Sequence, residues 1–356
     1  MSRPQPLHLC TALWRRGACA ELPLGVDSRR GSRQSATSGY SWSWLVAVSD
    51  GAQVSKFDLP VPTGSWSDER AERGCSLSPC DGLIDPTEDR LHTLRYDAGA
   101  GAYDRLTGRW SRMYVDPVLD AARVREGSHV LDVATGTGDA AIAASNRVGR
   151  AGRVVAVDIS VPMLQEASHK ASGRAIEFTE GDAQRLFYAD GSFDSIVCLF
   201  GLMFVPDKIA ALGGFRRVLR PGGRVAATSW GHPSQAPFAG RVAEALAEQL
   251  PHDRADLLRP FSLADAGESV GLFRAAGFTD VSAELQTMLS PFASFEGDFW
   301  EPIEAGGGRL GQAYLGLSPG GRKAVRQRVL SYLPVRAVSE PFTLQHSAWV
   351  ISAGAG

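Results

Sequence analysis

The feature that most constrains this chain is a glycine-rich turn that directly follows an apolar run. Residues 130–139 read Val-Leu-Asp-Val-Ala-Thr-Gly-Thr-Gly-Asp, and a stretch of small residues typical of a helix continues to Val148. Gly136 and Gly138 allow a tight turn and leave no Cβ between the backbone and a ligand. The pattern therefore predicts a strand–turn–helix unit, the opening of a nucleotide-binding α/β domain.

Further apolar runs follow the turn at the spacing of a parallel sheet. The first of them ends in Asp158, about 20 residues after the glycines, where a carboxylate can bind a ribose diol. A helix over about 206–219 precedes the last of them, and this alternation predicts parallel βαβ units. The expected strands are 154–158, 175–183, 193–200 and 219–230.

These ordered motifs resemble those of class I S-adenosylmethionine (SAM)-dependent methyltransferases, most closely the broad ubiquinone/menaquinone-biosynthesis group (methyltransferase type 11). The resemblance covers residues 100–230 and rests on the glycine turn, Asp158, Gly-Asp-Ala at 181–183 and Leu-Arg-Pro-Gly-Gly at 219–223. It implies an α/β fold with a Rossmann-like, doubly wound, seven-stranded sheet whose last strand is antiparallel. It also implies SAM as methyl donor, a helical N-terminal cap and a helical insertion before the last strand.

The resemblance assigns residues to each part of the cofactor. Asp132 is expected to contact the ammonium, directly or through water, Asp158 the ribose hydroxyls and Asp182 the adenine amine. Each carboxylate also has a simpler interpretation: Asp132 satisfies loop N–H groups, Asp158 caps the helix that starts near Ser160, and Asp182 forms a turn. The full set of expected cofactor contacts is Asp132, Ala134, Gly136, Gly138, Asp158, Ile159, Met163, Asp182, Ala183 and Leu199.

Catalytic candidates are fewer. The resemblance places Tyr103 near the SAM methyl group and Arg109 near the acceptor, although Tyr103 and Trp110 are equally typical of helix packing. His232 follows the fifth strand and is the nearest candidate for a general base, whereas His346 falls within an expected strand and is expected to be structural.

The expected acceptor is a small, aromatic or lipophilic molecule, methylated on carbon or oxygen. The loop at 201–207 is apolar and contains no histidine, as suits such an acceptor. The true quinone methyltransferases carry a Glu-Phe-Ser-like end to the fifth strand, but here that strand ends Ala-Thr-Ser-Trp at 227–230. The resemblance therefore leaves the identity of the acceptor open.

Two other classes of function compete with a methyltransferase. Gly136-x-Gly138-x-x-Ala141 also fits a loose dinucleotide fingerprint, which would suit an NAD(P)-dependent oxidoreductase. That alternative explains neither the Gly-Asp-Ala motif nor the Leu-Arg-Pro-Gly-Gly run, and the sequence contains no Tyr-x-x-x-Lys pair. A non-catalytic interaction protein would have no need of all three carboxylates.

Composition restricts the partners further. The net charge is −2, and no apolar run is long enough to span a membrane, so we expect a soluble, cytoplasmic protein that binds a small molecule rather than nucleic acid. Cys198 is expected in the core, and the scattered Cys10, Cys19, Cys75 and Cys80 do not complete a metal site. The oligomeric state stays open.

The chain divides into a leader and a domain. Residues 1–88 lack a sustained helical or strand period, and we expect a disordered leader or a segment upstream of the natural start, with a targeting peptide as a weaker alternative. The methyltransferase domain is expected over 89–356, and a chain that begins near Asp89 should fold and bind SAM. Its expected parts are the cap at 89–123, the core at 124–287, the insertion at 288–340 and the last strand at 341–356.

Overall fold

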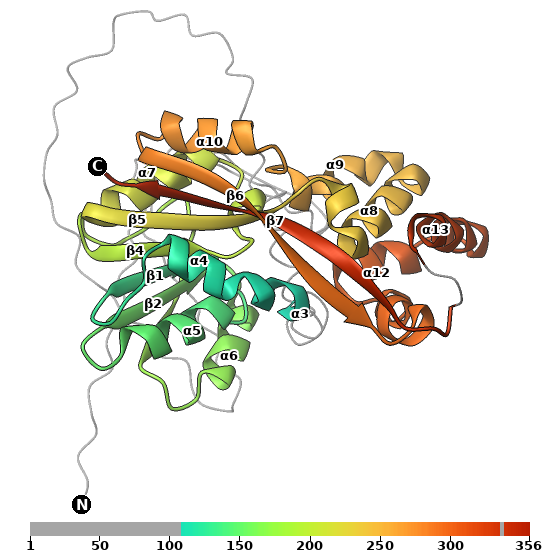
Figure 1. The fold of residues 1–356 in the computed structure, drawn as a ribbon, viewed down its shortest axis with the longest axis horizontal. Coiled ribbons are helices and arrows are strands. Elements are labelled where there is room, and N and C mark those ends of the chain that lie inside the picture. Colours follow the sequence, from blue (N-terminus) through green and yellow to red (C-terminus); the bar gives the residue numbers. More distant parts are fainter. Residues whose placement is uncertain (1–107, 335–337) are drawn as a thin grey trace, which may run out of the picture. The chain divides into compact units, whose positions relative to one another are not determined.

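The computed structural model describes residues 108–334 and 338–356. The leader at 1–88, Tyr103 and the first part of the cap lie outside these residues. The described part contains one seven-stranded sheet with the order β3-β2-β1-β4-β5-β7-β6 (Figure 1). Its strands are β1 (His129–Val133), β2 (Arg153–Asp158), β3 (Ile176–Glu180), β4 (Phe193–Cys198), β5 (Leu219–Trp230), β6 (Thr279–Phe292) and β7 (Phe342–Gly354).

The direction of the strands agrees with the predicted fold class. Strands β1 to β5 are mutually parallel, whereas β7 is antiparallel to both of its neighbours, β5 and β6. The sheet is therefore the doubly wound, Rossmann-like sheet of a class I methyltransferase. The apolar β1 lies inside the sheet between β2 and β4, and the residues Val130 to Val133 are all fully buried.

Helices cover both faces of the sheet. In Figure 1, α4, α5 and α6 lie on one side, and α7 and α10 on the other. Val118 and Leu119 of α4 join Ala140 and Ala144 of α5 in one apolar cluster against the sheet. The helices of the sheet region are α3 (Gly108–Ser111), α4 (Val115–Ala121), α5 (Asp139–Val148), α6 (Val161–Lys170), α7 (Lys208–Val218) and α10 (Ala266–Ala275).

A separate group of helices gathers around the far ends of β6 and β7 (Figure 1). It combines α8 and α9, which follow β5, with the helical insertion at 293–334. Helix α8 contacts α9, α12 and α13. The members of the group are α8 (Pro237–Gln249), α9 (Arg254–Leu258), a π-helical turn (Phe295–Trp300), α11 (Glu301–Glu304), α12 (Gly308–Leu315) and α13 (Pro319–Tyr332).

The structure corrects several expected boundaries. Residues 288–292, assigned to the helical insertion, continue β6 because they pair with residues 342–346 of β7. Pairing with β7 decides this assignment, because an aromatic residue at the end of β6 is compatible with a helix as well as with a strand. The expected helix at 206–219 is shorter, since Asp207 caps α7 and its side chain accepts a hydrogen bond from the Ala210 N–H.

A glycine marks the end of α10. Gly277 follows this helix with φ of 87°, a left-handed conformation that favours glycine, and leads into β6. Among the described helices, none has the length and apolar composition needed to cross a membrane.

Candidate functional site

The glycine turn joins β1 to α5 through three left-handed residues. Ala134, Gly136 and Gly138 have φ of 55°, 54° and 84°. A Cβ on Gly136 would meet nothing within 4 Å, so the backbone conformation, not space, requires glycine there. A Cβ on Gly138 would lie 2.9 Å from the Cβ of Ala167, so this glycine allows α6 to approach closely. The turn is thus shaped both for a ligand and for helix packing.

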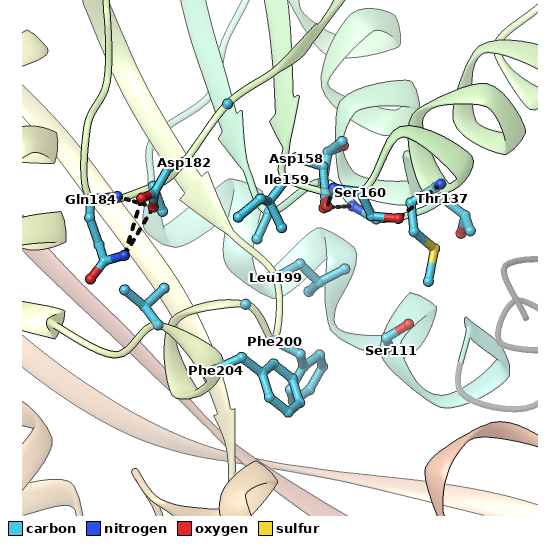
Figure 2. A pocket seen from close by; sticks show the side chains of 18 of the residues that line it. Ser111, Thr137, Asp158, Ile159, Ser160, Asp182, Gln184, Leu199, Phe200 and Phe204 are labelled. Atoms are coloured by element: carbon cyan, nitrogen blue, oxygen red, sulfur yellow. Dashed lines mark hydrogen bonds between the residues drawn. The ribbon is translucent and has the colours of Figure 1, made fainter. Parts of the chain in front are cut away.

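Asp158 links this turn to the end of β2. One carboxylate oxygen accepts the Gly136 N–H at 2.8 Å, and the other accepts the Ser160 N–H at 2.9 Å (Figure 2). The cap of α6 is Ser160, whose hydroxyl accepts the Met163 N–H. The interpretation of Asp158 as that cap is therefore wrong. Each carboxylate oxygen has a second lone pair, so these contacts leave capacity for ligand hydroxyls.

Asp182 organises the loop after β3. Its Oδ1 accepts the backbone N–H of Gln184 at 2.8 Å and the Gln184 side-chain amide at 3.1 Å (Figure 2). Gln184 in turn accepts the N–H of Asp207 at 3.0 Å and so connects the loops that follow β3 and β4. Sequence reasoning missed Gln184, because only the folded sheet brings residues 184 and 207 together.

These segments enclose a pocket at the carboxyl ends of β1 to β4, which we call the glycine-loop pocket. It contains about 1190 Å³ of empty space, part of it open to solvent. Eight of the ten predicted cofactor contacts line it: Ala134, Gly136, Asp158, Ile159, Met163, Asp182, Ala183 and Leu199. Figure 2 labels Asp158, Ile159, Asp182 and Leu199 among them. Gly138 and Asp132 do not line it.

Several other lining residues are not among the ten predicted cofactor contacts. Ser111 belongs to α3, and the others lie next to predicted residues in the same turns or in the apolar loop after β4: Thr135, Thr137, Asp139, Ser160, Gly181, Gln184, Phe200, Gly201, Phe204, Val205 and Pro206. Phe200 is notable because its φ of 54° is unusual for a bulky residue. Its N–H donates to the hydroxyl of Thr228 at 2.8 Å.

Asp132 lies fully buried beneath the glycine turn. Its Oδ2 accepts a hydrogen bond from the Thr135 hydroxyl at 2.6 Å, and within the part of the chain that the structure describes its Oδ1 has no hydrogen-bond partner. Burial raises the pKa of Asp132 to about 7, although the hydrogen bond from Thr135 opposes the rise, and the charge of Asp158 adds to it. A contact between Asp132 and a ligand ammonium stays a prediction.

Of the three catalytic candidates, the two that the structure describes do not line this pocket. Tyr103 lies outside the described residues. Arg109 donates to Asp298 at 2.6 Å and to the carbonyl of Pro291 at 2.6 Å, and so ties α3 to the helical insertion. His232 is exposed and caps the short turn Pro233–Gln235, where its ring accepts the Ser234 N–H. Neither Arg109 nor His232 lines the glycine-loop pocket.

His346 has the structural position that was expected. Its ring stacks on Trp110 with centroids 4.8 Å apart, and the residue is 2 % exposed. Burial, together with the nearby charge of Arg109, lowers the pKa of His346 to about 4. The imidazole is therefore neutral at neutral pH.

Comparisons with known proteins support the methyltransferase interpretation. A model of the ubiE/COQ5 methyltransferase family matches residues 103–247. The chain is 38% identical over 157 residues to the ubiquinone/menaquinone biosynthesis C-methyltransferase UbiE of Hahella chejuensis, and this match covers 42% of the chain and 63% of the relative. The chain is 32% identical over 213 residues to the demethylmenaquinone methyltransferase of Staphylococcus epidermidis, and that match covers 54% of the chain and 87% of the relative.

Among solved structures, a phosphoethanolamine N-methyltransferase 2 of Haemonchus contortus is similar with a TM-score of 0.49 and 20% identity, over 76% of this chain and 60% of that one. The comparisons do not support the alternative of an NAD(P)-dependent oxidoreductase. On the sequence matches and the sheet together, the chain belongs to the ubiE/COQ5 methyltransferase family, a group of class I SAM-dependent methyltransferases.

Proposed function

We propose that this protein transfers the methyl group of SAM to a small, aromatic or lipophilic acceptor, on carbon or on oxygen. The observation that carries the proposal is the arrangement of two carboxylates at the ends of adjacent strands. Asp158 follows β2, Asp182 follows β3, and both line one pocket with the glycine turn. This spacing suits a nucleoside that presents ribose hydroxyls to one carboxylate and an adenine amine to the other.

The other lining residues fit the same ligand. Ile159 is 47 % exposed and Met163 is buried, and both offer apolar atoms to the adenine faces. Gly136 has no side chain in the way of the methionine part, and the backbone of Ala134 lines the same pocket. Asp182 and the N–H of Ala183 are the proposed partners of the adenine edge.

When bound, SAM supplies an electrophilic methyl group: an electron pair of the acceptor forms the bond to the methyl carbon, the carbon–sulfur pair returns to sulfur, and the acceptor loses a proton. Charge is dispersed in such a displacement, so the protein contributes mainly by alignment and exclusion of water. Leu199, Phe200 and Phe204 provide apolar walls for this purpose. The names of the relatives support an acceptor of the hydroquinone type.

The proposal is tested by incubating the protein with methyl-labelled SAM and a panel of hydroquinones, phenols and amines, with mass spectrometry of the products. We expect S-adenosylhomocysteine to form in step with a methylated hydroquinone or phenol. Calorimetric titrations with SAM and with NADH give a second readout. Binding of NADH without binding of SAM, or binding of SAM with no methylated product from any class, would contradict the proposal.

Asp132 provides a prediction on pH. Because its pKa is raised, the Asp132 carboxyl keeps its proton in the folded protein between about pH 4 and about pH 7, whereas in the unfolded chain it has lost this proton. The stability that this neutral carboxyl contributes is therefore present at low pH and is lost as the pH rises through about 7. We expect Asp132→Asn to remove this share of the pH dependence, measured by denaturant melts from pH 5 to pH 8.

The same group distinguishes the two interpretations of Asp132. If the ammonium of SAM contacts Asp132, the positive charge lowers its pKa, and SAM binding at pH 6.5 releases a proton. Titration calorimetry in two buffers of different ionisation enthalpy measures this release, which Asp132→Asn should abolish. Equal proton release by the wild type and the variant would contradict a contact with the ammonium and would show that Asp132 only supports the turn.

A further inference from the structure

The helical insertion encloses a second pocket, which we call the aromatic pocket. Its walls come from Trp110 of α3, Trp230 at the end of β5, Phe238 of α8, Arg309 and Leu310 of α12, and His346 of β7. It holds about 540 Å³ of empty space, less than half that of the glycine-loop pocket. Half of its wall lies beyond residues 103–247, the part that the family model matches.

Three polar atoms of this wall are buried and have no hydrogen-bond partner among the described residues: Nε1 of Trp110, Nε2 of His346 and Nη1 of Arg309. Trp110 and His346 are only 4 % and 2 % exposed. Arg309 pairs with Asp256 through its other terminal nitrogen. Buried polar atoms in folded proteins nearly always have a partner, so three without one at a single apolar pocket indicate a ligand with polar atoms.

The two pockets are neighbours. Phe200 lines the glycine-loop pocket, Trp230 lines the aromatic pocket, and their rings stack with centroids 4.1 Å apart. Consecutive residues of α3 repeat this relation, since Ser111 lines the first pocket and Trp110 the second. Two stacked rings, Phe200 and Trp230, therefore lie between the proposed cofactor and a ligand in the aromatic pocket.

We propose that the aromatic pocket binds the oxygen-bearing ring of the methyl acceptor. The ring packs against Trp110, Trp230 and Phe238, and its oxygens accept hydrogen bonds from the Trp110 indole and the Arg309 guanidinium. A hydroxyl of the ring donates a hydrogen bond to Nε2 of His346. The inference rests on the proposed function, and it adds the site, the polar partners and the preference for a hydroxylated ring. The stacked rings of Phe200 and Trp230 must then move aside for the two ligands to meet.

The test compares 1-naphthol with 1-methylnaphthalene, which replaces the hydroxyl by a methyl group. Binding to the full chain with S-adenosylhomocysteine present is measured by calorimetry. We expect 1-naphthol to bind at least tenfold more tightly, because a buried polar wall discriminates against a ring that leaves it unpaired. His346→Phe should reduce this preference about tenfold and weaken 1-methylnaphthalene little.

A second variant tests where the probes bind rather than which polar atoms they contact. Leu310→Trp fills the pocket and should weaken the binding of both probes at least tenfold. Leu315, at the end of the same helix, is 41 % exposed, and Leu315→Trp should weaken the binding of neither probe. Affinity for SAM should stay within about twofold in all variants, which also shows that they fold.

Unchanged probe affinity in Leu310→Trp, or equal affinity of the wild type for both probes, would overturn the proposal. The polar atoms of the pocket would then be partnered by water. Failure of the proposed function has a different signature. In that case the wild type binds no SAM or makes no methylated product, whatever the naphthol titrations show.

Discussion

Replacing Asp158 by alanine should raise the dissociation constant for SAM about a hundredfold. Hydrogen bonds to a charged group are worth about 1.5–3 kcal/mol each, and about 1.4 kcal/mol corresponds to a tenfold change, so the loss of two gives at least this effect. The variant also leaves the N–H groups of Gly136 and Ser160 without their acceptor, so the glycine turn loses an anchor. Titration calorimetry measures the affinity, and a denaturant melt measures the stability.

A modified ligand separates direct binding from support of the turn. The wild type should bind S-adenosylhomocysteine about a hundredfold more tightly than its 2′,3′-dideoxy analogue, and Asp158→Ala should not distinguish the two. Asp190→Ala, which removes an exposed carboxylate paired with Arg217, serves as the control and should leave both affinities unchanged. Discrimination that persists in Asp158→Ala, or a lowered melting midpoint with unchanged affinity, would refute the ribose role.

Replacing Gly240 by alanine should destabilise the protein by about 3 kcal/mol. Gly240 lies in the first turns of α8, where a Cβ would be 2.0 Å from the carbonyl oxygen of Pro233. That atom belongs to the backbone and cannot rotate away, so α8 must shift, and overpacking costs about 1–3 kcal/mol or more. In a domain of this size we expect the melting midpoint to fall by about 6–12 °C.

Gly213→Ala is the matched control. Gly213 lies in the middle of α7, is exposed, and a Cβ there would meet nothing within 4 Å. Because glycine is about 1 kcal/mol less favourable than alanine inside a helix, this variant should be slightly more stable than the wild type. Similar melting midpoints for the two variants would show that Pro233 does not restrict position 240.

The order of the core elements could be read from the chain because local patterns determine it. The apolar run before Gly136, the carboxylate at Asp158 and the Gly-Asp-Ala motif at 181–183 each lie within one strand and the turn that follows it. Parallel strands place such turns at one edge of the sheet, so a shared pocket follows from the order alone. Eight of the ten predicted cofactor contacts accordingly line it, and their roles await the experiments above.

The boundary of the helical insertion and its contacts could not be predicted from local sequence patterns. Residues 288–292 are a strand because residues 342–346 pair with them, about 50 or more positions away. Arg109 donates to Asp298 of the helical insertion, and the bridge from Gln184 to Asp207 joins two loops. No local pattern predicts such partners, since each depends on how elements far apart in sequence pack.

The sequence by itself determined the doubly wound sheet, the glycine turn and the carboxylates that follow β2 and β3, because strand period, turn chemistry and spacing are local properties. Only the tertiary structure decided that Asp132 is buried with a raised pKa, that Phe200 stacks on Trp230, and that Trp110, His346 and Arg309 share one wall. Burial and contact depend on several elements at once, and they arise only when the sheet, α8 and the helical insertion pack together.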